Sequence, residues 1–264
     1  MDARTETTES SERGPRRGGL AHAIALVRTT VYSVTATLYF LLTTTICVWV
    51  MLFPPQKMRH FLIWWARGDL FLLRLICGQS YEVRGEANRP QGPALVASKH
   101  QAAWETLALL PILPRGAFIL KKELLKIPIY GAYARFFGMI PVDRTGGAAA
   151  LKQLDTDAKD AIAKGFQIII FPEGTRQLVG APPDYKPGAI FLYDRLNVPL
   201  VPVALNSGLY WPRRRFVRYP GKIIVSFLPA IPPGLKRTEA TERLKVAIEE
   251  ETAKIVAEAR QAAR

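Results

Sequence analysis

A histidine and a glutamate five residues apart form the first candidate for chemistry in this chain of 264 residues. They lie in the stretch SKHQAAWET as His100, one of three histidines, and Glu105. An imidazole serves as a general base near neutral pH, and a carboxylate on its far ring nitrogen fixes its tautomer. Five helical residues turn through about 500°, so the pair forms only if His100 precedes the helix that carries Glu105. Taken alone, the pattern is equally explained by a helix-capping histidine and a glutamate on the solvent face.

A second candidate is the turn FPEGTR at 171–176, which directly follows the apolar run FQIII. Its Gly174 favours a turn, and Thr175 and Arg176 offer hydrogen-bond donors that suit a phosphate. The simpler alternative is a strand-to-loop turn with an exposed arginine.

Two further stretches share this form of a short apolar strand followed by polar residues. MIPVDR at 139–144 ends in Arg144, which is a second candidate phosphate ligand, although a salt bridge from Asp143 to a basic neighbour explains the pair equally well. VPLVPVALN at 198–206 carries two prolines, which indicate an edge strand or the wall of a channel. It has no evident chemistry of its own.

The elements that must position these residues begin at about Tyr81, where short apolar runs alternate with helical patterns. The candidate strands are YEVRG, PALVAS, AFILK, MIPV, FQIII, LVPVAL and KIIVSF. The candidate helices are 102–110, 124–137, 147–164 and a final one at 238–260, whose buried stripe is Leu244, Ile248, Ile255 and Ala259. Strands alternating with helices predict an α/β domain with a mostly parallel sheet flanked by helices. Residues just past a strand's carboxyl end then face the functional crevice.

The N-terminal part has a different character and predicts membrane-anchoring helices. Val31–Phe53 is 23 residues without a charge, long enough to span a bilayer, with a buried core helix as the alternative. Charges interrupt 59–77, which favours an amphipathic segment at the lipid surface over a second membrane span or a helix docked on the domain. The predicted organisation is a basic disordered tail at 1–22, a membrane-anchoring region at 23–80 and the α/β domain at 81–264.

The composition points to an anionic partner. The formal net charge is +14, and no zinc-finger spacing, basic zipper or RNA-binding signature is present, so a membrane surface is favoured over nucleic acid. The two cysteines, Cys47 and Cys77, lie in apolar surroundings without metal-ligand spacing, and we expect both to pack as small hydrophobic residues.

Together, the blocks H-x4-acid, IPVDR, FPEGTR and VPV occur in an order that resembles the lysophospholipid acyltransferase family, and within it the 1-acylglycerol-3-phosphate acyltransferases. The resemblance covers about Tyr81–Phe227. Two positions depart from the family pattern: Glu105 stands where aspartate is usual, and Lys99 stands where asparagine is usual. Glutamate keeps the charge and adds one methylene group.

The resemblance implies acyl transfer from a thioester to the sn-2 hydroxyl of lysophosphatidate, which makes phosphatidate for phospholipid biosynthesis. It implies a base, an orienting acid and a phosphate-binding turn. The catalytic residues are then His100 and Glu105, and the substrate-binding residues are Arg144, Glu173, Gly174, Thr175 and Arg176, with Lys121 and Lys122 as further candidates. A thiolate leaves with little acid help, and neither a metal nor a cofactor is implied.

The implied partners are membrane lipids, namely lysophosphatidate and an anionic phospholipid surface, and an acyl donor that is acyl-CoA or acyl carrier protein. No nucleic acid is expected. The implied location is a membrane, at the cytoplasmic face of a bacterial inner membrane. Two alternatives stay open: an acyltransferase for another lyso-lipid, such as a lyso-ornithine lipid or a lysophospholipid with a head group, and a non-catalytic membrane protein that binds lipid.

Overall fold

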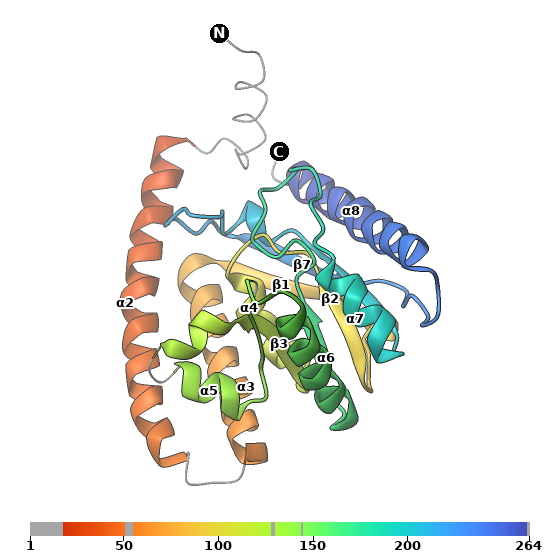
Figure 1. The fold of residues 1–264 in the computed structure, drawn as a ribbon. Coiled ribbons are helices and arrows are strands. Elements are labelled where there is room, and N and C mark those ends of the chain that lie inside the picture. Colours follow the sequence, from red (N-terminus) through yellow and green to blue (C-terminus); the bar gives the residue numbers. More distant parts are fainter. Residues whose placement is uncertain (1–17, 51–54, 128–129, 144, 263–264) are drawn as a thin grey trace.

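A computed structural model of the chain describes residues 18–50, 55–127, 130–143 and 145–262. Its centre is a seven-stranded sheet in the order β1-β7-β6-β2-β5-β3-β4 (Figure 1). The strands are β1 (Gln79–Arg84), β2 (Ala94–Ser98), β3 (Gly116–Lys121), β4 (Ile140–Val142), β5 (Gln167–Ile170), β6 (Leu200–Leu205) and β7 (Gly221–Phe227). All neighbours are parallel except β6 and β7. The predicted α/β class and all seven predicted strands are confirmed.

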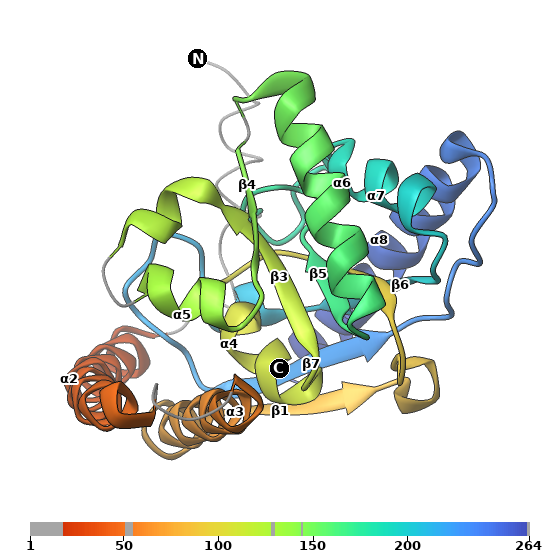
Figure 2. The same ribbon diagram turned by 60° about the horizontal axis from the view of Figure 1, so that its bottom comes forward.

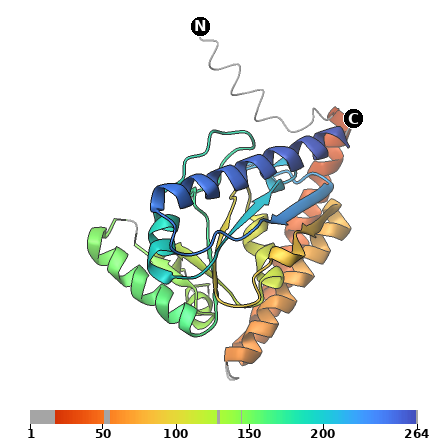
Figure 3. The ribbon, with the colours of Figure 1, turned by 90° about the vertical axis from the view of Figure 1, so that its right-hand side faces the viewer.

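Helices cover both faces of this sheet (Figures 2 and 3). They are α2 (Gly19–Val50), α3 (Pro55–Leu72), α4 (Trp104–Ile112), α5 (Tyr130–Phe136), α6 (Gly147–Ala163), α7 (Gly188–Leu196) and α8 (Arg237–Gln261). Shorter turns are a π-helix at Leu73–Cys77 and 3-10 segments at Glu86–Asn88, Lys122–Lys126 and Ser207–Leu209. The sequence did not predict α7, a nine-residue helix that begins directly after Pro187. Its buried stripe of Ala189, Leu192, Tyr193 and Leu196 has the i, i+3, i+4, i+7 spacing that identifies a helix.

The central strand β2 separates two apolar layers. Val96 faces the layer that includes α3 and α4, whereas Leu95 and Ala97 face the layer of α6, α7 and the first half of α8. Successive side chains of a strand point to opposite faces, so both faces of β2 are buried and its sequence is apolar throughout.

The expectation that the prolines of 198–206 mark an edge strand is wrong, because β6 lies between β7 and β2 and is buried along its whole length. The Pro202 carbonyl accepts a hydrogen bond from the Leu228 amide at 3.0 Å, so this side of Pro202 faces β7. The β7 strand ends at Phe227. The missing N–H of Pro202 therefore falls where the antiparallel pairing ends, and an interior strand tolerates it there.

The N-terminal helix α2 is longer than the apolar run that predicts it. It begins at Gly19 and includes Arg28, because arginine is a good helix former although its charge ends a hydropathy run. Within the described residues, Gly19–Thr45 is the one helix that is long and apolar enough to cross a membrane. One side of α2 contacts both α3 and the α/β domain: the Tyr32 hydroxyl donates to Asp69 of α3 at 2.9 Å, and the Thr29 hydroxyl accepts from the Arg218 amide of the domain at 2.9 Å.

Helix α3 is docked on the domain, which was one of the alternatives open for 59–77. It packs against α2 and α4 (Figure 2). The Arg59 guanidinium donates to the carbonyls of Pro114, Gly116 and Phe137 at 3.0, 3.1 and 2.7 Å and lies over the Phe166 ring. Burial, with a contribution from Arg115, lowers the pKa of Arg59 to about 10, so this side chain remains charged at neutral pH.

We expect Arg59→Met to lower the free energy of unfolding by about 2 kcal/mol, because it leaves three backbone carbonyls without their charged donor. The melting temperature in detergent should then fall by about 4–8 °C. Arg67→Met is the matched control, because Arg67 is an exposed arginine of the same helix. Equal melting temperatures for the two variants would show that Arg59 does not hold α3 to the domain.

Candidate active site

His100 and Glu105 form a hydrogen-bonded pair at the carboxyl end of β2. The His100 Nδ1 atom lies 2.9 Å from Glu105 Oε1. His100 sits in the turn between β2 and α4, and Glu105 lies in the first turn of α4, as the sequence requires if the two are to pair. The carboxylate accepts at Nδ1, so Nδ1 carries the proton of the neutral ring and Nε2 holds the free lone pair. The imidazole also stacks on Phe171, with centroids 3.9 Å apart.

The Glu105 carboxylate is fully buried and held by three further donors. Its Oε1 accepts from the amides of Gln101 and Ala102 at 2.6 and 2.7 Å, and its Oε2 accepts from the Ser207 hydroxyl at 2.8 Å. These bonds fix the carboxylate and leave it directed at the ring, so it can stabilise an imidazolium. The sequence did not identify Ser207. The sequence signal that could have identified it is its position, since Ser207 follows β6 as His100 follows β2.

The FPEGTR segment makes the turn that the sequence predicts. Gly174 has a φ of +66°, a left-handed conformation that favours glycine, and its amide bonds to the Phe171 carbonyl at 2.9 Å. Glu173, which the resemblance places among the substrate-binding residues, is fully buried. It accepts a hydrogen bond from the His100 amide at 2.8 Å and forms an ion pair with the Lys99 ammonium at 2.6 Å. Burial raises the pKa of the Glu173 carboxyl, and Lys99 opposes this rise. Glu173 therefore holds the His100 turn and does not line the cavity.

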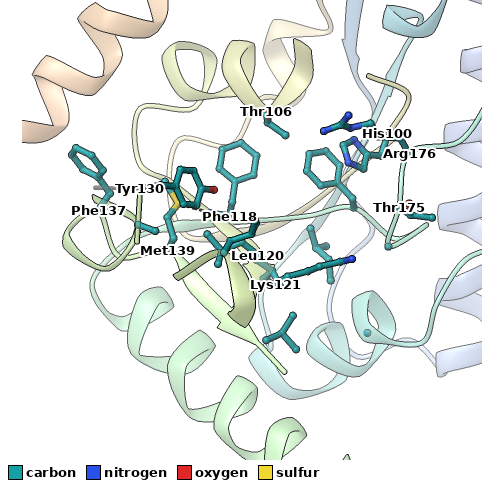
Figure 4. Close-up of a pocket in the computed structure, with 18 of the residues that line it drawn as sticks. His100, Thr106, Phe118, Leu120, Lys121, Tyr130, Phe137, Met139, Thr175 and Arg176 are labelled. Atoms are coloured by element: carbon teal, nitrogen blue, oxygen red, sulfur yellow. Dashed lines mark hydrogen bonds between the residues drawn. The ribbon is translucent and has the colours of Figure 1, made fainter. Parts of the chain in front are cut away.

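A cavity of about 1120 Å³ leads away from His100 (Figure 4). Its far part is apolar and includes Phe61 and Trp65 of α3, and Tyr130, Phe137 and Met139 near α5. The volume exceeds the range of about 300–1,000 Å³ that is usual for small-molecule sites, so it suits a long apolar chain.

The end of the cavity near His100 is basic. Thr175 and Arg176 lie beside His100 there, and Lys121 extends toward them (Figure 4). Arg144 lies outside the described residues, and Lys122 does not line the cavity but lies 3.8 Å from Asp143.

Two arginines outside the predicted motif blocks also line the cavity, namely Arg213 and Arg214. Among the described residues, no carboxylate lies within 4.0 Å of the guanidinium groups of Arg176, Arg213 or Arg214. Unpaired cations in a concave site favour an anionic ligand.

The described residues hold no group of three or more His, Cys, Asp or Glu side chains that could bind a metal ion. Cys77 is a buried free thiol, and burial raises its pKa. The chemistry that this site offers is therefore that of a histidine base with a carboxylate partner, next to a basic pocket and an apolar cavity.

Comparisons with known proteins identify the family of this chain. The acyltransferase family model matches residues 80–206. A 1-acyl-sn-glycerol-3-phosphate acyltransferase of Pseudomonas aeruginosa is 36% identical over 205 residues, which are 75% of this chain and 80% of that protein. The human 1-acyl-sn-glycerol-3-phosphate acyltransferase alpha is 32% identical over 62% of this chain and 59% of its own length.

A crystal structure of the 1-acyl-sn-glycerophosphate acyltransferase from Thermotoga maritima has the same fold, with a TM-score of 0.70, 23% identity, and coverage of 88% of this chain and 95% of that one. The resemblance that the sequence motifs indicate is thus confirmed. The chain belongs to the acyltransferase family, together with the bacterial and animal 1-acyl-sn-glycerol-3-phosphate acyltransferases.

Proposed function

We propose that this protein transfers an acyl chain from a thioester to the sn-2 hydroxyl of lysophosphatidate and so makes phosphatidate. The observation that carries the proposal is the placement of the bonded His100–Glu105 pair where an apolar cavity meets unpaired arginines. A lyso-lipid has a hydroxyl between an acyl chain and a phosphate, and this order matches the order of the site.

In the proposed reaction, Nε2 of His100 takes the proton of the sn-2 hydroxyl as its oxygen attacks the thioester carbonyl. The C–S bond then breaks, and the thiolate leaves with the proton returned from the imidazolium or from water. Glu105 holds the ring and stabilises its positive charge in between. Both substrates are bound together, because this direct attack needs no acyl-enzyme intermediate.

The acceptor phosphate is proposed to bind Arg176, with Thr175 as a further donor, and Arg213 and Arg214 add positive charge to the lining of the cavity. Gly174 lets the turn approach the phosphate closely, and Arg144 remains a candidate from its position in the sequence alone. An acyl chain occupies the apolar part of the cavity, where its burial is favourable by about 0.8 kcal/mol per methylene group.

We propose a location at the membrane, where the lipid acceptor lies. The outward side of α2 exposes apolar residues to its surroundings, and the chain is strongly basic, as anionic lipid surfaces favour. The exposed apolar residues of α2 include Val27, Val31, Val34, Leu38, Leu41 and Leu42. Because acyl-CoA and acyl carrier protein are cytoplasmic, the proposed face is the cytoplasmic one.

The direct test is an acyl-transfer assay with the full chain in detergent micelles. Lysophosphatidate is offered with palmitoyl-CoA or with palmitoyl-acyl carrier protein, and phosphatidate is the expected product. A lyso-ornithine lipid and lysophosphatidylethanolamine are tested in parallel. Transfer to one of these and none to lysophosphatidate would make the acceptor assignment wrong. Lipid binding without transfer to any acceptor would favour the non-catalytic alternative.

We expect Arg176→Gln to raise KM for lysophosphatidate about 10-fold and to leave KM for the acyl donor within about twofold, because one charged phosphate contact is lost. Arg215→Gln is the control: Arg215 is exposed and does not line the cavity, yet its loss removes the same charge from the chain. Equal rises in KM for both variants would mean that arginines act only through general attraction to an anionic micelle.

A further inference from the structure

Lys99 is a buried cation directly beside the proposed base, and nothing in the reaction above uses it. Its side chain is 3% exposed. The ammonium lies 2.6 Å from Glu173 Oε1, and 2.7 and 3.0 Å from the two carboxylate oxygens of Glu249 on α8. A lysine is almost never buried unless it is paired, so these two carboxylates account for its position.

The side chains of Lys99 and His100 point to opposite faces of the sheet. Side chains alternate along β2, and the alternation continues into the next two residues. His100 turns to the α4 side, where it meets Glu105, while Lys99 turns to the side of α8. Lys99 therefore does not line the cavity, and its substitution leaves the substrate contacts in place.

Glu173 links the Lys99 side chain to the backbone of His100. Its Oε1 pairs with Lys99, and its Oε2 accepts from the His100 backbone amide at 2.8 Å. The His100 carbonyl is held as well, by the Gln177 amide at 2.7 Å. The backbone of the proposed base is thus fixed by the turn at 171–177, and the carboxylate that makes the key bond is fully buried. A buried carboxylate keeps its charge and place only beside a partner such as Lys99.

Glu249 extends this network to the final helix. It is the more accessible of the two acids, with a side chain 25% exposed, and it also accepts from the Tyr185 hydroxyl at 2.9 Å. Loss of Glu249 therefore leaves the Lys99–Glu173 pair intact. Loss of Lys99 instead leaves two carboxylates facing each other, one of them fully buried, so we expect the greater effect from Lys99.

We propose that Lys99 is a positioning residue for acyl transfer: by pairing with Glu173 and Glu249 it fixes the carboxylate that holds the backbone of His100, and so places the imidazole against Glu105 and the acceptor hydroxyl. This inference rests on the proposed role of His100. It assigns a function to the lysine that stands where the family pattern has asparagine, and it makes α8, outside the matched residues 80–206, part of the support of the site.

The test compares kcat, KM for both substrates and the melting temperature of the full chain in detergent. We expect Lys99→Met to lower kcat by about 10–100-fold with each KM within about threefold, because a displaced base affects the chemical step and not binding.

Three further variants test the network around Lys99. Lys99→Arg should keep at least about a third of the wild-type kcat, and Glu249→Gln should lower kcat about two- to fivefold. The double variant Lys99→Met/Glu173→Gln should recover at least about threefold over Lys99→Met, since the amide oxygen of glutamine still accepts from the His100 amide and no fully buried carboxylate is left without its cation.

Arg84→Met is the matched control. Arg84 pairs with Glu258 at 2.7 Å and so also ties α8 to the sheet, but it does not touch the His100 turn. Its kcat should stay within about twofold of the wild-type value. If it falls as far as that of Lys99→Met, or if folded Lys99→Met keeps wild-type kcat, the positioning role is wrong. If Lys99→Met does not fold, Glu249→Gln and the double variant decide. A wild-type kcat for Glu249→Gln overturns the role, and so does a double variant that folds with its kcat still reduced more than about 50-fold.

The proposed function is judged separately in the same assay. A wild-type protein that makes no phosphatidate, or a His100→Ala variant as active as the wild type, counts against the acyl-transfer mechanism itself. An active wild type, an inactive His100→Ala and an unchanged Lys99→Met would overturn only the role of Lys99.

Discussion

His100→Ala is expected to lower kcat for phosphatidate formation about 10³-fold, a larger loss than we expect from a substitution of any other residue at this site. Without the imidazole, no other group described at this point can take the hydroxyl proton, because Glu105 is fully buried and its oxygens are occupied by donors. KM should change little, since the phosphate and the acyl chain keep their own contacts. Steady-state kinetics with a radiolabelled acyl donor would measure both quantities.

Two further variants test whether the loss of kcat reflects proton transfer by His100. His100→Gln keeps a polar side chain that can donate to Glu105 but cannot act as a base, and it should be as inactive as His100→Ala. His60→Ala removes an exposed histidine from α3, away from β2, and should retain kcat within about twofold. If His100→Gln keeps more than about a tenth of the wild-type kcat, proton transfer at this position does not limit the reaction.

Glu105→Gln is expected to lower kcat about 10²-fold with a small change in melting temperature. The amides of Gln101 and Ala102 point at Oε1, so the glutamine oxygen takes that place and still accepts from His100 Nδ1. The amide nitrogen then faces the Ser207 hydroxyl, which accepts as well as it donates. The ring keeps its tautomer and orientation, and the loss therefore reports the negative charge that stabilises the imidazolium.

Ser207→Ala is the companion measurement. It removes one donor from Glu105 Oε2 but leaves both the charge and the bond to His100, so kcat should fall by no more than about 10-fold. A kcat for Glu105→Gln within about twofold of the wild type would mean that Glu105 only orients the ring. A loss as large as that of His100→Ala would instead indicate that the amide has turned over and reversed the tautomer.

The elements of this protein follow largely from local sequence. The seven strands coincide with short apolar runs, and α6 ends as expected, with Gly165 at a φ of +78° directly after Lys164. The predicted stripe of α8 is buried at Leu244, Ile248 and Ile255. These features depend on periodicity and on the conformational preference of single residues, which act over a few positions along the chain.

Local sequence patterns gave wrong or incomplete predictions where contacts between distant segments determine the structure. Pro202 indicated an edge strand, but the interior position of β6 depends on where β7 ends, which no local pattern contains. Hydropathy placed the apolar segment at Val31–Phe53, whereas the helix begins at Gly19. Its Thr29 contacts the domain and its Tyr32 bonds to α3. The docking of α3 through Arg59 likewise depends on carbonyls distant in the sequence.

The sequence by itself identified the candidate site residues, namely His100 with Glu105 and the FPEGTR turn with Arg176, and the order of the motifs indicated the acyltransferase family. Only the tertiary structure decided what surrounds them. Strand β2 lies between β5 and β6, so the residues that follow these three strands converge on one edge of the sheet. That convergence gives His100 its stacking partner Phe171, gives Glu105 its donor Ser207 and brings Glu173 to Lys99, and the packing of α8 adds Glu249. These contacts join positions separated by about 70–150 residues, and the physical cause is strand order, which local sequence patterns do not encode.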